Sequence, residues 1–153
     1  MVDTKGFYSL ILMSYVYGTL RTSITGTPEG LARVSNALQT CEHGEDFKDW
    51  FMKDWALAVK NPKKATHGRQ TVTIDHFWDE VTPIVEMLVE LGQKMPELGI
   101  KIVCKVANSV TDSYIRFTVQ KYPDEPGWYC PTWLDINSAA GVLRVEFPKK
   151  GDT

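Results

Sequence analysis

Hydrophobic and polar residues alternate between residues 70 and 120 in a pattern that predicts a strand, a helix and two further strands. Thr71 to Asp75 form a short alternating run, and two later runs repeat with the same period of two. One helix laid over one face of this small sheet would bury the apolar set of both later runs. These sets are Ile100, Ile102, Cys104 and Val106 in one run and Ile115, Phe117 and Val119 in the other.

The helix of this unit is predicted to begin at Thr82 and to end at Met95. Thr82 stands before Pro83, so a hydroxyl can cap the helix and the missing proline N–H costs nothing in the first turn. Pro96 disfavours helical geometry at Met95 and stops the helix. The apolar residues recur at spacings of three and four, which is typical of an amphipathic helix. They are Val81, Ile84, Val85, Leu88 and Leu91.

The first part of the chain is predicted to form a strand followed by two helices. Residues 7–25 favour one long bent strand or two short ones, with Gly18 as the bulge or turn. We interpret residues 7–17 as a buried strand or hairpin arm, with a signal peptide as the alternative. Thr27 and Pro28 then start a helix that ends near Thr40.

A second helix, from Glu42 to Val59, carries aromatic residues on one face. The simpler interpretation is that this face packs on the domain. The alternative is that one or both of Trp50 and Trp55 are partly exposed and anchor a partner, since tryptophan is enriched at binding hot spots.

The remaining segments are predicted to be two loops, a hairpin and a tail. Residues 60–69 form a basic loop, and residues 122–133 form a loop rich in proline and aromatic side chains. Residues 134–136 and 142–147 predict a closing hairpin, followed by a polar tail. No repeat or linker interrupts the chain, so we expect residues 1–153 to form one α+β domain, an antiparallel sheet with helices mainly on one face.

The composition of the chain restricts the classes of function to consider but does not identify one. Hydrophobic residues make up 43% of the chain and charged residues 24%, which is ordinary for a globular protein. The formal net charge of −2 gives no global attraction to nucleic acid or to an anionic membrane, so either would require a local patch. Three widely spaced cysteines suit free thiols in a reducing cytoplasm. We therefore expect a cytoplasmic protein without a membrane segment.

The residue patterns that catalysis or metal binding requires do not emerge from the sequence. Cys41 and His43 are the one close Cys/His pair, and zinc ligands usually come in converging pairs. Neither a glycine-rich phosphate loop nor a nucleophile elbow occurs. We therefore expect a protein that is not an enzyme and that uses no metal or cofactor.

Two features suggest a surface that binds a larger protein or nucleoprotein complex. Acidic residues recur along the central helix opposite its apolar stripe, where they could complement a basic partner. The aromatic loop offers rigid contact area at low entropy cost. The residues predicted to contact such a partner are Asp79, Glu86, Glu90, Glu97, Trp128, Tyr129 and Trp133.

A nucleic-acid interface is the alternative prediction. It would combine the basic loop with basic residues on the outer face of the sheet, where Tyr114 could stack on a base. Its predicted residues are Lys60, Lys63, Lys64, Arg69, Lys101, Lys105 and Arg116.

Two segments resemble the YubB-type ferredoxin-like domains of plasmids and phages. The stretch from Gly18 to Arg33 is similar to the opening strand and the Gly-x-Pro-Glu helix start of that family. Thr71 to Trp78, the proline-started helix and Pro96-Glu-Leu98 resemble its second half, although Trp78 lacks the Ser-Pro-Pro that usually follows. The resemblance implies a ferredoxin-like core, with the aromatic helix and the last hairpin as additions, and a mobile-element origin. It implies no activity.

These observations together favour a small non-enzymatic inhibitor, phage- or plasmid-borne, that binds a host defence complex such as a CRISPR effector. An immunity protein that neutralises a toxin would use the same surfaces. The nucleic-acid-binding domain is the alternative of a different class. The sequence leaves the oligomeric state open.

Overall fold

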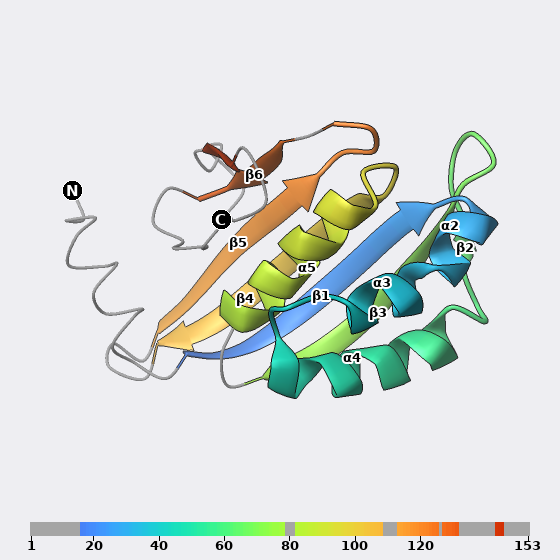
Figure 1. The fold of residues 1–153 in the computed structure, drawn as a ribbon. Helices are drawn as coiled ribbons and strands as arrows, with labels where there is room; N and C mark the ends of the chain where they lie inside the picture. Colours follow the sequence, from blue (N-terminus) through green and yellow to red (C-terminus); the bar gives the residue numbers. More distant parts are fainter. Residues whose placement is uncertain (1–15, 79–81, 109–112, 126, 132–142, 146–153) are drawn as a thin grey trace.

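The computed structural model describes residues 16–78, 82–108, 113–125, 127–131 and 143–145. Within them the chain is α+β, with four helices on one side of a sheet (Figure 1). The helices are α2 (Pro28–Ala32), α3 (Val34–Gln39), α4 (Glu45–Ala58) and α5 (Thr82–Lys94). The strands are β1 (Val16–Gly26), β2 (Lys63–Lys64), β3 (Gln70–Trp78), β4 (Gly99–Asn108), β5 (Ser113–Lys121), β6 (Trp128–Cys130) and β7 (Leu143–Val145).

The seven strands pair in the order β2-β3-β1-β4-β5-β6-β7. Every neighbouring pair is antiparallel apart from β6 and β7, which run parallel. Helix α5 connects β3 to β4, which lie on opposite sides of β1 in a split β–α–β unit. A ferredoxin-like β-α-β-β-α-β order has one strand after its second helical connection, whereas here the long antiparallel pair β4 and β5 follows α5. The ferredoxin-like part of the prediction is therefore not confirmed.

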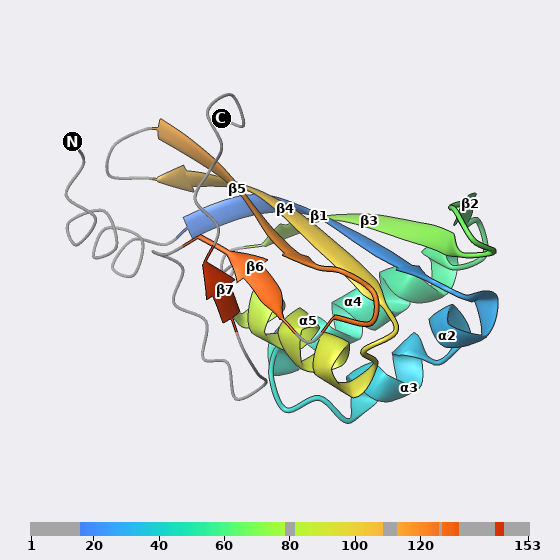
Figure 2. The ribbon, with the colours of Figure 1, turned by 90° about the horizontal axis from the view of Figure 1, so that it is seen from above.

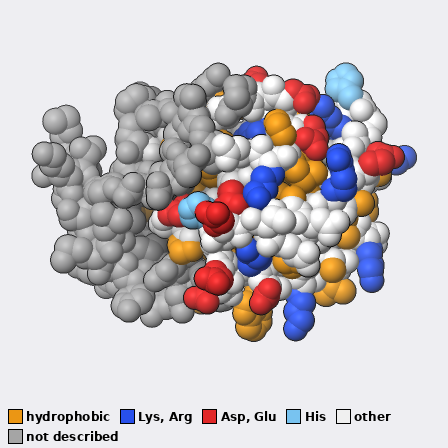
Figure 3. Space-filling view, in the orientation of Figure 1, with side chains coloured by type: hydrophobic (Ala, Val, Ile, Leu, Met, Phe, Trp, Pro, Cys, Tyr) orange, Lys and Arg blue, Asp and Glu red, His pale blue; other side chains and the backbone are white. Residues whose placement is uncertain are grey.

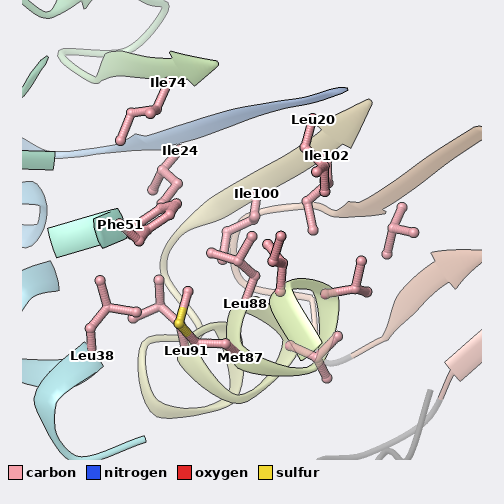
Figure 4. Close-up of a cluster of buried hydrophobic side chains, with 14 of the residues drawn as sticks. Leu20, Ile24, Leu38, Phe51, Ile74, Met87, Leu88, Leu91, Ile100 and Ile102 are labelled. Atoms are coloured by element: carbon pink, nitrogen blue, oxygen red, sulfur yellow. The ribbon is translucent and has the colours of Figure 1, made fainter. Parts of the chain in front are cut away.

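The hydrophobic core lies between the sheet and the helices (Figure 4). Alternate residues of β1, β3, β4 and β5 point toward the helices, because successive side chains of a strand point to opposite faces. Leu20, Ile24, Ile74, Ile100 and Ile102 from the sheet meet Leu38, Phe51, Met87, Leu88 and Leu91 from the helices.

Local sequence explains where the first and last helices begin. The Thr27 hydroxyl accepts the Gly30 N–H at 3.1 Å, and Pro28 occupies the first turn, as predicted. The chain bends at Arg33, so the single predicted helix is two short ones. Helix α5 begins at Thr82 and ends at Lys94, which confirms the predicted helix.

Two other predicted segments differ from the structure, and two more lie wholly or mostly outside the described residues. The basic loop contains β2, which pairs with β3 across a turn where His67 and Gly68 both have positive φ. The aromatic loop contains β6. The predicted closing hairpin lies mostly outside the described residues, and its described strand β7 pairs with β6 in parallel. The predicted strand at residues 7–15 also lies outside them.

Candidate functional site

One face of the sheet has no helix against it in the described part of the chain, and we call it the open face (Figure 2). Its residues are those that alternate with the buried set of each strand. They are Thr19, Arg21, Ser23 and Thr25 on β1; Thr71, Thr73, Asp75 and Phe77 on β3; Lys101, Val103 and Lys105 on β4; and Tyr114, Arg116, Thr118 and Gln120 on β5.

At the end of the open face nearest β2, the side chains of β1 and β3 are hydroxyl groups that bond to one another. The hydroxyls of Ser23 and Thr73 lie 3.1 Å apart, and those of Thr25 and Thr71 lie 2.8 Å apart. Such cross-strand hydroxyl pairs stabilise the sheet by a few tenths of a kcal/mol. These two strands therefore offer no charge here, and Lys101 on β4, the register partner of Ser23, is a cation at this end.

The middle of the open face holds an ion pair that cancels its own charge. Arg21 donates to both carboxylate oxygens of Asp75, with its Nε 2.8 Å from Oδ1 and its Nη2 3.3 Å from Oδ2. The hydrogen bond from Arg21 lowers the pKa of Asp75, so the carboxyl group is ionised at neutral pH. Both side chains are exposed, so the pair contributes little to stability.

The far end of the open face carries positive charge that no described carboxylate cancels. Phe77, Thr19, Lys105 and Arg116 are register partners in succession across β3, β1, β4 and β5, and we call them the cationic row. Lys105 and Arg116 face each other directly. Like charges in that position repel and destabilise a sheet. Among the described residues, neither side chain has an acidic partner within ion-pair distance.

Two exposed aromatic rings flank this charge. The Tyr114 side chain is 70% exposed and that of Phe77 is 65% exposed. The Lys105 Nζ lies 5.1 Å from the centre of the Tyr114 ring, within the range of a cation–π interaction. Aromatic rings next to cations can stack on an unpaired base while the cations meet the phosphates.

The predicted nucleic-acid residues fall into two groups rather than one patch. Lys101, Lys105 and Arg116 lie on the open face, as the alternation predicts. Lys60, Lys63 and Lys64 are exposed around β2, at the opposite end of β3 from Phe77. Arg69 instead forms an ion pair with Asp124, its Nη2 3.3 Å from Oδ2.

The predicted acidic stripe is not a continuous exposed surface. Glu90 is buried, with 11% of its side chain exposed, and both of its oxygens accept the Glu42 N–H at 2.9 Å. Its Oε1 also lies 2.7 Å from His43 Nδ1. Burial opposes ionisation of Glu90, yet the hydrogen bonds from His43 and from the Glu42 and His43 backbone outweigh it and lower the pKa to about 2. The Glu90 carboxylate therefore holds the turn at Glu42 and His43, which precedes α4, against helix α5.

The other acidic residues do not complete the stripe. Glu86 Oε2 lies 3.5 Å from His43 Nε2, on the other side of the same imidazole. Glu97 follows the end of α5 and lies 3.4 Å from Arg33 Nη2. Asp79 lies outside the described residues.

The aromatic loop covers an edge of the core. Trp128 and Cys130 are buried, and Tyr129 is partly buried with its ring edge-on to Tyr122, the two centroids 5.7 Å apart. Trp128 lies against Gly92 of α5, where an added Cβ would come within 2.7 Å of the indole. Trp133 lies outside the described residues. Trp128 is therefore a core residue, and its indole is not available to a partner.

The aromatic helix separates its two tryptophans. Trp55 is buried with Phe47 and Phe51, while Trp50 on the outer side is 63% exposed. Figure 3 shows the helical side of the molecule, where acidic and basic side chains are mixed and hydrophobic ones are scattered among them. The open face therefore carries the clearer concentration of one charge.

The described side chains offer little for nucleophilic catalysis. Burial raises the pKa of the Cys41 thiol to about 12 and also raises the pKa values of Cys104 and Cys130, so all three are protonated at neutral pH. No cluster of three potential metal ligands occurs among the residues that the structure describes. No described helix is long and apolar enough to span a membrane.

Two residues of the cationic row, Thr19 and Phe77, were not among the predicted site residues. The signal was present, because Val72 and Ile74 face the core and Phe77 therefore falls on the opposite face with Thr73 and Asp75. An aromatic residue at an outward position is the kind of exception that points to a binding surface.

We compared the chain with models of known protein families, with curated proteins and with solved structures, and none of these comparisons found a match.

Proposed function

We propose that the protein binds nucleic acid through the open face, with Lys105 and Arg116 contacting phosphate groups. The observation that carries the proposal is the direct pairing of these two like charges beside the exposed Tyr114 ring. A bound phosphate would reduce the repulsion between Lys105 and Arg116, because it supplies the negative charge that no described residue places beside them. Three buried thiols fit a reducing compartment, so we expect the protein to act in the cytoplasm.

The local patch must provide this affinity without help from the rest of the molecule. With a formal net charge of −2, the whole chain attracts a polyanion weakly at best. Binding should therefore depend steeply on salt and on a few named side chains. The patch is also unlike a surface for self-association, because two copies facing each other across it would oppose positive charge with positive charge.

Matched charge reversals test the proposal. The full chain is titrated against a fluorescein-labelled 20-nucleotide single strand at about 50 and about 200 mM salt. The double variant K105E/R116E should bind at least about tenfold more weakly, with a smaller salt slope. The control K63E/K64E changes the net charge equally at the other end of β3, and its affinity should stay within about threefold of the unaltered chain. Equal losses in both variants, or no binding by the unaltered chain, would contradict the proposal.

A protein-binding inhibitor is the second candidate, and the exposed side of α4 favours it. Trp50 and Leu57 are seven residues apart, so they share one side of the helix, and Leu57 is 66% exposed. Exposed tryptophan and leucine so placed could anchor a protein partner. The YubB-type resemblance and its ferredoxin-like core stay predictions; if they hold, a host defence complex or a toxin is the class of partner to test. Capture of one protein from nuclease-treated lysate, lost in W50A but retained in K105E/R116E, would favour this candidate.

A further inference from the structure

We propose that the open face selects single-stranded nucleic acid, with one unpaired base stacked on Phe77, another on Tyr114 and the connecting phosphates over the cationic row. The inference rests on the proposed function and names the form of nucleic acid that the site takes. RNA and DNA strands share the chemistry involved, which is an exposed base face and a phosphate.

The spacing of the two rings suits a short stretch of strand. Phe77 and Arg116 are separated by three strand spacings, which is about 14 Å, and Tyr114 lies two residues further along β5, about 7 Å away. The two rings are therefore about 16 Å apart by the geometry of a regular sheet. Stacked nucleotides advance about 3.4 Å each, so the rings span about five stacked steps and fewer in an extended strand. We infer a site of about four to six nucleotides.

The side chains between the rings fit the backbone of such a strand. The Lys105 ammonium group lies over one face of the Tyr114 ring, so a base stacked on the other face would place its phosphate near a cation. Arg116 is the register partner of Lys105 and can donate two hydrogen bonds to one phosphate. Thr19 lies between Lys105 and Phe77, so the row offers a hydroxyl on the path to the second ring.

A duplex cannot use the same arrangement. Its bases are stacked on one another, so neither ring could reach a base face without unpairing the helix. A duplex would be held only by its phosphates on Lys105, Arg116 and Lys101. The two rings should therefore matter for single strands and leave duplex binding unchanged.

Fluorescence anisotropy on the full chain tests this inference. The probes are labelled oligo(dT) and oligo(U) of 3, 6 and 12 nucleotides and a 12-base-pair DNA duplex. We expect affinity to rise steeply between 3 and 6 nucleotides and the 12-nucleotide strands to bind at least about tenfold more tightly than the duplex. The variants F77A and Y114A should each weaken single-strand binding at least about fivefold. The control W50A removes an exposed aromatic ring from the helical side and should change nothing.

The results separate this inference from the proposed function. If strand and duplex bind equally, or if the F77A and Y114A chains bind strands as the unaltered chain does, the inference is overturned while K105E/R116E still tests charge-based binding. If none of the probes binds, both are overturned. Y114F keeps the ring, so full affinity in Y114F together with a loss in Y114A supports stacking and excludes a role for the hydroxyl group.

Discussion

The buried carboxylate of Glu90 provides a prediction that depends directly on the structure. The substitution E90Q keeps the shape of the side chain and removes its charge. An oxygen can still accept the Glu42 N–H, but the charge-assisted contact with His43 is lost. We therefore expect E90Q to lower the free energy of unfolding at pH 7.

The magnitude follows from the pKa of Glu90. A fall from the ordinary value of 4.5 to about 2 corresponds to about 3 kcal/mol if the whole shift stabilises the folded state. Water reaches the edge of this side chain and screens part of the interaction, so we expect about 1–2 kcal/mol. Because the folded-state pKa is the lower one, this stabilisation is present above pH 4.5 and is lost as the pH falls toward 2.

Urea unfolding followed by tryptophan fluorescence at pH 7, 5 and 3 measures this effect. The difference between E90Q and the unaltered chain should fall by more than half between pH 7 and pH 3. The control E97Q removes a carboxylate from an exposed pair with Arg33 and should cost less than about 0.5 kcal/mol. An E90Q chain as stable as the unaltered one, or a loss that is the same at pH 7 and pH 3, would refute the reasoning.

Three further predictions concern the fold. G92A should lower the free energy of unfolding by about 1–3 kcal/mol in urea, because the new Cβ would come within 2.7 Å of the Trp128 indole; no loss would mean that β6 does not pack there. K121M should cost about 2 kcal/mol by the same assay, because the Lys121 ammonium group donates to three backbone carbonyls, at 2.6, 2.9 and 3.1 Å; full stability would remove this role. Burial lowers the pKa of His76, so the free energy of unfolding should decrease as the pH falls below 6.5. H76F removes this group, so its free energy of unfolding should depend less on pH between 6.5 and 5. An unchanged slope would contradict this assignment.

The elements with strong periodicity were predictable from the sequence. Helix α5 and strands β4 and β5 follow directly from their apolar spacing, and Thr27 and Pro28 locate the start of α2. Antiparallel pairing and helices on one face follow because each strand alternates and so has one apolar side. Lys121 shares the inward parity of Phe117 and Val119, so its burial was also readable, though its three carbonyl partners were not.

The misread features depend on contacts between distant segments. Glu90 lies opposite the apolar stripe, yet it is buried because the turn at Glu42 and His43 folds back over α5. Trp128 is buried because β6 continues the sheet and brings the indole against Gly92. Helical periodicity records which residues share a face, and it does not record which other segment covers that face.

The candidate site was predictable in part for the same reason. Alternation placed Lys101, Lys105 and Arg116 on the outer face, and Tyr114 with them. The cationic row needed the strand order, because Phe77 and Arg116 are far apart in the chain and meet in one row only when β1 and β4 lie between them.

Amide chemical-shift mapping can locate nucleic acid on the open face residue by residue. An isotopically labelled chain is titrated with an unlabelled six-nucleotide single strand, and the backbone N–H signals are followed. We expect the shifts to concentrate at Thr19, Phe77, Lys105 and residues 114–116, with α4 and α5 unaffected. Shifts confined to α4 around Trp50, or no shifts at millimolar strand, would contradict this expectation.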